Sequence, residues 1–230
     1  MVVFFIKEEI PEATISSTMH LFSLPCMIRG WRLCRLLSAN GSLKNNQKGK
    51  TMNKKVLIIS SSPRKGGNSD ILCDEFAAGA KEAGNKVEKV RIADKKIGYC
   101  TGCYACQKTG TCAIKDDAKK IIDKMMAADV IVLASPVYFY SISAQLKALF
   151  DRTVVVYPNL TNKKFYFILT MADTNRKMFD GVLAAMRGFL ACCDGSKECG
   201  MVCASGVYEK GTVKNTKFMS AARKLGMKVT

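Results

Sequence analysis

Short apolar runs and amphipathic segments alternate along the chain from residue 56 onward. A short continuous apolar run is typical of a parallel strand that is buried on both faces of a sheet. Five such runs, separated by segments with helical spacing, predict an α/β fold with a doubly wound five-stranded parallel sheet. The predicted strands are residues 56–59, 87–92, 130–134, 165–169 and 201–204.

The segments between these runs have the apolar spacing of helices that cover a sheet. The first places Leu72, Phe76 and Ala80 on one face. We expect Asp116 to cap the helix that follows the second strand, and Gly226 to end the last helix. Further helices are predicted over residues 143–153 and 178–190.

The first 51 residues do not share this pattern. They contain neither a signal-peptide profile nor the ~20 consecutive apolar residues of a membrane helix. Residues 40–50 are polar and rich in Gly, Lys and Asn, which is the composition of a linker. We therefore predict an N-terminal extension, 1–51, and a domain, 52–230, whose functional start is Met52. An organelle-targeting segment is the alternative, because three arginines in the extension are regularly spaced.

Small and polar residues, 60–69, join the first strand to the first helix. Backbone N–H groups at a helix N-terminus and the helix dipole favour a bound anion, and Gly66 and Gly67 allow close approach. The order of residues matches neither a P-loop nor a Gly-x-Gly-x-x-Gly turn. We predict a phosphate site here, and an ordinary turn rich in small residues is the alternative. The candidate ligands are Ser62, Arg64, Lys65, Asn68 and Ser69.

A second loop, residues 135–141, follows the third strand and contains three consecutive aromatic residues. In a sheet of order 2-1-3-4-5, which we expect here, strands one and three flank the switch point where ligands bind. A planar apolar ring would lie against these aromatics, and backbone groups would bind its edge. A core-facing turn is the alternative. The candidate residues are Pro136, Val137, Tyr138, Phe139 and Tyr140.

The sequence of residues 62–69, SPRKGGNS, together with that of residues 136–152, PVYFYSISAQLKALFDR, resembles the NADPH-dependent FMN reductase family of flavodoxin-like proteins. The resemblance covers residues 54–225. It implies a flavodoxin-like fold, FMN with its phosphate on loop 62–69 and its ring near residues 136–140, NAD(P)H as a candidate substrate, and a homodimer or homotetramer. The family's third flavin loop corresponds here to residues 170–173 and lacks the usual glycines, so its contacts are not carried over.

Four cysteines in a compact run are the most informative chemical feature of the chain. Cys100, Cys103, Cys106 and Cys112 lie in a cysteine-rich loop, residues 97–115, after the second strand. Two overlapping CxxC steps match the run that wraps a [4Fe–4S] cluster in ferredoxins. Such a cluster would lie near the flavin ring, or near that of a partner subunit. A four-cysteine zinc site and free thiols are the alternatives.

The spacing of these cysteines suits metal ligands rather than disulfides, which predicts a reducing, cytoplasmic setting. Among the other cysteines, Cys73 is expected to pack as a small apolar residue. The same is expected of Cys192, Cys193, Cys199 and Cys203.

Charge narrows the class of partner. The chain has 36 Lys and Arg against 19 Asp and Glu, a formal net charge of +17. The lysines are scattered, without a basic helix or an aromatic ladder, so we expect neither nucleic acid nor a membrane as a partner. A basic surface suits acidic redox proteins or anionic cofactors such as NADPH.

Together, these features predict a flavin-dependent oxidoreductase that exchanges electrons with a small molecule or a protein. The subgroup with a compact cysteine motif, the iron–sulfur flavoproteins, implies electron transfer between a [4Fe–4S] cluster and FMN. A cluster-free NAD(P)H-dependent FMN or quinone reductase is the alternative, and a flavodoxin-type carrier ranks third because such carriers are usually small and acidic. No catalytic side chain is expected, because the cofactor performs the chemistry.

Overall fold

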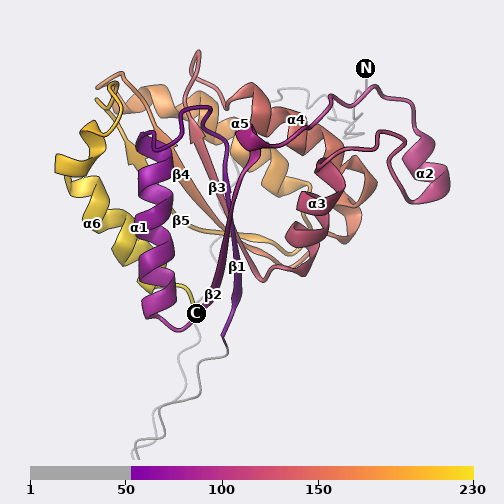
Figure 1. The fold of residues 1–230 in the computed structure, drawn as a ribbon, viewed down its shortest axis with the longest axis horizontal. Helices are drawn as coiled ribbons and strands as arrows, with labels where there is room; N and C mark the ends of the chain where they lie inside the picture. Colours follow the sequence, from indigo (N-terminus) through magenta and orange to yellow (C-terminus); the bar gives the residue numbers. More distant parts are fainter. Residues whose placement is uncertain (1–52) are drawn as a thin grey trace, which may run out of the picture. The chain divides into compact units, whose positions relative to one another are not determined.

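In the computed structural model, which describes residues 53–230, five parallel strands form one sheet in the order β2-β1-β3-β4-β5 (Figure 1). This confirms the predicted fold class and strand order. The predictions for residues 1–51 and for a start at Met52 lie outside the described residues. The strands are β1 (Lys55–Ser60), β2 (Lys86–Arg91), β3 (Val130–Pro136), β4 (Lys164–Thr170) and β5 (Lys197–Ala204).

Helices cover both faces of this sheet, as Figure 1 shows. α1 (Asn68–Glu82) and α6 (Lys217–Met227) lie on one face. α3 (Ala118–Ala127), α4 (Ala144–Arg152) and α5 (Asp180–Ala191) lie on the other. No helix within residues 53–230 is both long and apolar enough to cross a membrane.

The continuous apolar runs of the strands supply both hydrophobic cores. In β1, Val56 and Ile58 pack with side chains of α1 and α6, whereas Leu57 and Ile59 pack with those of α3, α4 and α5. Successive residues of a strand point to opposite faces, so a strand covered on both sides must be apolar at every position. The central strands were therefore the easiest elements to predict.

Two glycines allow α1 and α6 to cross in backbone contact. A Cβ on Gly79 would lie 2.0 Å from the carbonyl oxygen of Arg223, and one on Gly226 would lie 2.1 Å from that of Phe76. The prediction that Gly226 ends the last helix is therefore wrong: α6 continues to Met227. Close packing, and not termination, explains the glycine.

Two of the cysteines outside the motif depart from their prediction. Cys73, Cys193 and Cys203 are buried, as expected, but Cys192 and Cys199 are exposed. Cys192 follows the last residue of α5, where the helix no longer covers it. Cys199 lies at an irregularity in the pairing of β4 with the edge strand β5. Core packing is therefore the wrong prediction for these two.

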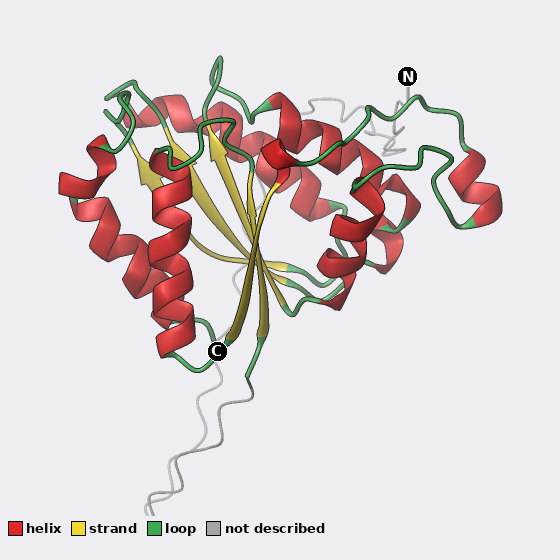
Figure 2. Ribbon diagram, in the orientation of Figure 1, coloured by secondary structure: helices red, strands yellow, loops and turns green. Residues whose placement is uncertain are grey.

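Loops gather at the carboxyl ends of the parallel strands, at the upper edge of the sheet in Figure 2. The predicted phosphate loop (residues 60–69) and the predicted ring loop (residues 135–141) both begin there. They follow β1 and β3, which are neighbours in the sheet. The cysteine-rich loop leaves the same edge from β2 and contains a short helix that was not predicted, α2 (Ala105–Thr109).

Candidate functional site

The loop between β1 and α1 has the features of a phosphate cradle. Gly66 has a φ of +65°, and a Cβ on Gly67 would lie 2.9 Å from the carbonyl oxygen of Arg64, so glycine is required at both positions. Ser62 and Ser69 are buried. The hydroxyl of Ser69 has no hydrogen-bond partner among the described residues. An unpaired buried hydroxyl beside the free N–H groups of a helix N-terminus is an arrangement that a phosphate oxygen satisfies.

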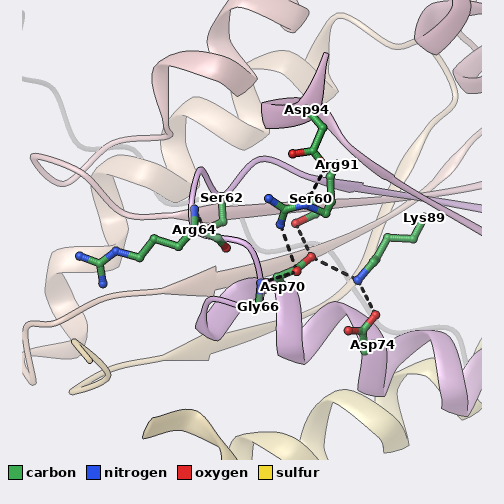
Figure 3. Close-up of polar contacts among 9 residues, drawn as sticks. All are labelled: Ser60, Ser62, Arg64, Gly66, Asp70, Asp74, Lys89, Arg91 and Asp94. Atoms are coloured by element: carbon green, nitrogen blue, oxygen red, sulfur yellow. Dashed lines mark hydrogen bonds and ion pairs between the residues drawn. The ribbon is translucent and has the colours of Figure 1, made fainter. Parts of the chain in front are cut away.

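Asp70, in the first turn of α1, fastens this loop to the sheet (Figure 3). Its carboxylate accepts the N–H of Gly66 at 3.0 Å and the hydroxyl of Ser60 at 3.1 Å. It also forms ion pairs with Lys89 at 3.2 Å and Arg91 at 3.0 Å, both on β2. One buried carboxylate therefore joins the loop to both β1 and β2.

The charges around Asp70 are arranged to keep it ionised. Burial alone would raise the pKa of Asp70, but the Gly66 N–H and the Lys89 ammonium together lower it below its ordinary value of 3.8. Two outer carboxylates, those of Asp74 and Asp94, pair with Lys89 and Arg91 on the solvent side (Figure 3). Sequence reasoning missed Asp70, because an acidic residue in a first helical turn is common for its favourable interaction with the dipole.

Arg64 and Lys65 lie on the outer side of the loop. The side chain of Arg64 extends away from Asp70 (Figure 3). Its Nη1 donates to the carbonyl of Tyr208 at 3.1 Å, and its guanidinium lies 5.7 Å from the centre of the Tyr208 ring. Lys65 is exposed. Both residues flank the cradle, and their contact with a phosphate remains a prediction.

Asn68 has a structural contact that the sequence did not reveal. Its amide nitrogen donates to the carbonyl of Glu209 at 2.9 Å, and its amide oxygen accepts the N–H of Gly211 at 2.9 Å. The side chain thus holds the loop between β5 and α6 against α1. Its amide is already bonded within the protein, so the group left for a phosphate is its backbone N–H.

A chain of buried serines connects the phosphate loop to the ring loop. The hydroxyl of Ser143 donates to that of Ser61 at 2.8 Å, and Ser61 donates to the carbonyl of Ala134 at 2.9 Å. The N–H of Ser143 donates to the hydroxyl of Ser135 at 2.9 Å. All three serines are fully buried. Buried hydrogen bonds therefore link the two loops to each other directly.

The ring loop ends in a tight hairpin whose aromatic side chains face outward. Tyr138 and Ser141 exchange backbone hydrogen bonds of 3.1 and 3.0 Å. Between them, Phe139 and Tyr140 have φ values of +47° and +59°, which are strained for residues other than glycine. Phe139 is fully exposed, which contradicts the alternative of a core-facing turn. The strain is the kind that binding sites retain.

The hairpin is held from the side of β4. Pro136 and Val137 are half-buried, and the N–H of Val137 donates to the carbonyl of Thr170 at 2.9 Å. The hydroxyl of Tyr140 donates to the carboxylate of Asp173 at 3.4 Å. The loop after β4 thus supports the ring loop, although its sequence lacks the glycines expected for direct flavin contact.

The cysteine-rich loop extends away from the sheet. Cys100 and Cys103 are exposed and Cys106 and Cys112 are half-buried, and all four are free thiols. Two hydrogen bonds lower the pKa of Cys103. The larger effect comes from the N–H of Ala105 and the smaller one from the hydroxyl of Thr101. Within residues 53–230, no three His, Cys, Asp or Glu side chains lie close enough together to hold a metal ion.

A sequence model described as NADPH-dependent FMN reductase matches residues 54–193. The chain belongs to this family. Membership confirms the resemblance drawn from the two loops, and it places both within a family of flavin-dependent oxidoreductases.

Several proteins that are similar in sequence to this chain carry a more specific name than the family does. Iron-sulfur flavoprotein MJ1083 of Methanocaldococcus jannaschii is 46% identical over 99 residues, which are 43% of this chain and 51% of that protein. The Iron-sulfur flavoprotein of Methanosarcina thermophila is 43% identical over 102 residues, 44% of this chain and 53% of that protein. The chain thus matches about half the length of these relatives.

Solved structures of this fold agree with the sheet topology. An NAD(P)H:quinone oxidoreductase from Methanothermobacter marburgensis superposes with a TM-score of 0.62 at 16% identity, over 76% of this chain and 96% of that one. An FMN-dependent NADH-azoreductase from Bacillus anthracis str. Ames Ancestor, in complex with FMN, gives a TM-score of 0.56 at 16% identity, over 75% and 97%. These likenesses establish the flavodoxin-like fold.

The residues of the family's two cofactor loops fit FMN. The unpaired Ser69 hydroxyl and the glycine-dependent cradle suit a phosphate, and the outward-facing aromatics suit a ring. The cysteine loop fits an iron–sulfur cluster in its donor chemistry, since it offers four free thiols at ferredoxin-like spacing. These thiols stand apart among the described residues, so binding of a cluster would require them to come together.

Proposed function

We propose that this chain is an iron–sulfur flavoprotein that passes electrons between a [4Fe–4S] cluster on residues 100–112 and FMN at the carboxyl ends of β1 and β3. The observation that carries the proposal is the placement of a flavin-type double loop and a four-cysteine loop on the same edge of one sheet. The names of the relatives support it. FMN supplies one- and two-electron chemistry, and the cluster supplies one-electron transfer.

In this proposal, each loop has a distinct task towards FMN. The backbone and hydroxyls of residues 62–69 bind the phosphate, with Asp70 holding the loop in shape. The aromatic hairpin covers one side of the ring. The N–H groups of Val137 and Tyr138 are used within the protein, which leaves those of Phe139 and Tyr140 for the edge of the ring.

The position of the cysteine loop favours electron transfer between subunits. α2 lies beyond α3 and α4, at the opposite side of the domain from α6 and well away from the 138–141 hairpin (Figure 1). We therefore infer that the cluster of one subunit serves the flavin of another in a homodimer or homotetramer. Light scattering of the anaerobic holoprotein should give a dimer or tetramer, and a stable monomer at micromolar concentration would contradict this inference.

The absorbance spectrum and iron content of anaerobically purified protein test the function directly. An iron–sulfur flavoprotein is brown, with broad absorption near ~400 nm overlapping the flavin bands, and it contains about four irons per chain. Anaerobic reconstitution with iron and sulfide follows if the isolated protein lacks iron. A protein that stays yellow after reconstitution rejects the cluster.

The separation of the four thiols favours one alternative, a cluster-free NAD(P)H-dependent FMN or quinone reductase. That function predicts normal flavin bands, negligible iron, and NAD(P)H oxidation that survives loss of all four cysteines. In both functions, the described residues bind and orient the flavin and no side chain is assigned to the chemistry.

The phosphate assignment leads to a separate prediction. Replacing Ser62 and Arg64 with alanine should weaken FMN binding about tenfold or more, because a hydroxyl donor and a nearby cation are lost from the cradle. Fluorescence titration of the flavin-free protein measures this. Lys147→Ala, which removes an exposed cation from α4, is the control. Equal affinities for the double variant and the wild type would reject Ser62 and Arg64 as phosphate ligands.

A further inference from the structure

The cysteine-rich loop is closed at its base by one buried arginine. Arg152, the last residue of α4, has a side chain that is 1% exposed. Its Nη1 donates to the carbonyl of Gly98 at 2.9 Å, and its Nη2 donates to that of Ile114 at 3.1 Å. These two carbonyls lie on either side of the four cysteines. A single guanidinium thus holds together the point where the loop leaves the domain and the point where it returns.

Asp116 completes this clasp, which consists of Arg152, Asp116 and the backbone of Gly98 and Ile114. Its carboxylate binds Arg152 in a bidentate manner, with contacts of 2.6 and 3.1 Å. It also accepts the N–H of Gly98 at 2.7 Å and that of Ala118 at 3.0 Å. Gly98 is therefore held through both its carbonyl and its N–H, while no residue from 99 to 117 is buried.

Fold stability is a weak explanation for the clasp. Removing a guanidinium from water is costly, and a buried ion pair often contributes less than apolar side chains of similar size. Here the Nε of Arg152 is also buried without a hydrogen-bond partner in the described structure. A buried charge that is incompletely satisfied is better explained by a task at the loop than by packing.

The position of Cys112 indicates that task. Cys112 lies two residues before Ile114, whose carbonyl accepts a hydrogen bond from Arg152. Cys112 is half-buried and lines an open pocket of about 420 Å³ together with Ile114, Asp116 and Lys96. Cys112 is thus the cysteine of the motif that lies nearest in sequence to the returning end of the clasp, whereas Cys100 and Cys103 are exposed.

We propose that Arg152 is a positioning residue that holds Cys112 and both ends of the cysteine loop in place, and that its charge raises the reduction potential of a cluster bound there. This rests on the proposed function. Hydrogen bonds and positive charge at a ligating sulfur favour the reduced, more negative cluster. Only arginine has the planar fork that reaches two carbonyls and a carboxylate together.

The first test uses full-length, FMN-loaded, cluster-free protein. Trypsin can cut the loop after Lys108 or Lys115, so the rate of cleavage reports how often the loop opens. We expect R152M to be cut about tenfold faster than the wild type at unchanged FMN content. K147M removes an exposed cation from the same helix and should be cut at the wild-type rate. R152M cleaved no faster than K147M would overturn the positioning role.

The second test uses reconstituted protein. We expect R152M to retain less than half the iron of the wild type after gel filtration, and its remaining cluster to have a more negative midpoint potential by EPR titration. R152K should recover much of the potential but not the protection from trypsin, because its charge is kept and its fork is lost. A purely structural role would leave the midpoint potential unchanged, and that result would overturn the tuning role.

Two further outcomes distinguish failure of the role of Arg152 from failure of the proposed iron–sulfur function. If R152M loses FMN or its cooperative melting transition, D116N replaces it, because that variant breaks the same pair while keeping the size of the side chain. If the wild type binds no iron, the proposed function and the tuning role both fail. The trypsin comparison then still decides whether Arg152 positions the loop.

Discussion

Replacing any one of four cysteines with serine should remove the broad cluster absorption and most of the iron while leaving FMN bound. The four are Cys100, Cys103, Cys106 and Cys112. Thiolate sulfur holds iron–sulfur clusters far better than a hydroxyl oxygen, so each single substitution should leave the centre with an open ligand position. The flavin loops follow β1 and β3 and do not include these residues, so flavin fluorescence after denaturation should report full occupancy. Iron analysis and the reduced-state EPR signal measure the loss.

Two cysteines outside the motif serve as matched controls. Cys192→Ser changes an exposed thiol, like Cys100, and Cys73→Ser changes a fully buried one. Both should retain the cluster, although Cys73→Ser places a hydroxyl in an apolar site and should lower the melting temperature. Loss of iron in Cys192→Ser, or full iron in two or more of the motif variants, would contradict the ligand assignment.

Asp70→Asn should weaken FMN binding although Asp70 is not itself a proposed FMN ligand. The change removes the charge that pairs with Lys89 and Arg91, and it turns one acceptor oxygen into a donor beside the Gly66 N–H. Disrupting a largely buried pair of this kind should lower the free energy of unfolding by about 2 kcal/mol. The loosened loop should raise the FMN dissociation constant about tenfold. Denaturant unfolding and fluorescence titration measure the two effects.

Asp74→Asn is the matched control for this prediction. Asp74 also pairs with Lys89, but its side chain is 63% exposed and it does not contact the phosphate loop. Its substitution should leave FMN affinity unchanged and should alter the free energy of unfolding by less than about 1 kcal/mol. Equal effects of the two substitutions would show that the loop does not depend on Asp70.

The pH dependence of stability has a definite sign at Asp70. Its pKa in the folded protein lies below the ordinary value of 3.8, because the Gly66 N–H and Lys89 outweigh the opposing effect of burial. The stabilisation is therefore fully present above about pH 4 and is lost as the pH falls through the folded pKa. The stability difference between wild type and Asp70→Asn should be constant from pH 7 to pH 5 and should shrink below pH 4.

The sequence predicted the parts of the fold that depend on continuous patterns. β1 and β3 are apolar at nearly every position because both faces are covered, and that pattern is readable without a structure. β5 begins at Lys197, earlier than predicted. Its first residues lack an apolar pattern because they are polar and partly exposed at the sheet edge. Gly226 was misjudged because a glycine that allows helix contact and one that ends a helix look the same in sequence.

The sequence predicted those parts of the candidate site whose residues all lie in one loop. The serines and glycines of residues 62–69 and the spacing of the four cysteines are local features. Asp70 and Arg152 were missed because their partners lie on other elements: Lys89 and Arg91 on β2 for Asp70, and Gly98 and Ile114 for Arg152. Long-range contacts of this kind leave no periodic trace in the sequence.

The buried serine chain should make the two halves of the proposed flavin site thermodynamically dependent on each other. Ser61 lies in the phosphate loop, Ser135 lies at the start of the ring loop, and Ser143 bonds to both. A ligand that orders one loop therefore lowers the cost of ordering the other, and the coupling is the same in either direction. Riboflavin, which has the ring without the phosphate, should bind more tightly when inorganic phosphate is present, and phosphate should bind more tightly when riboflavin is present.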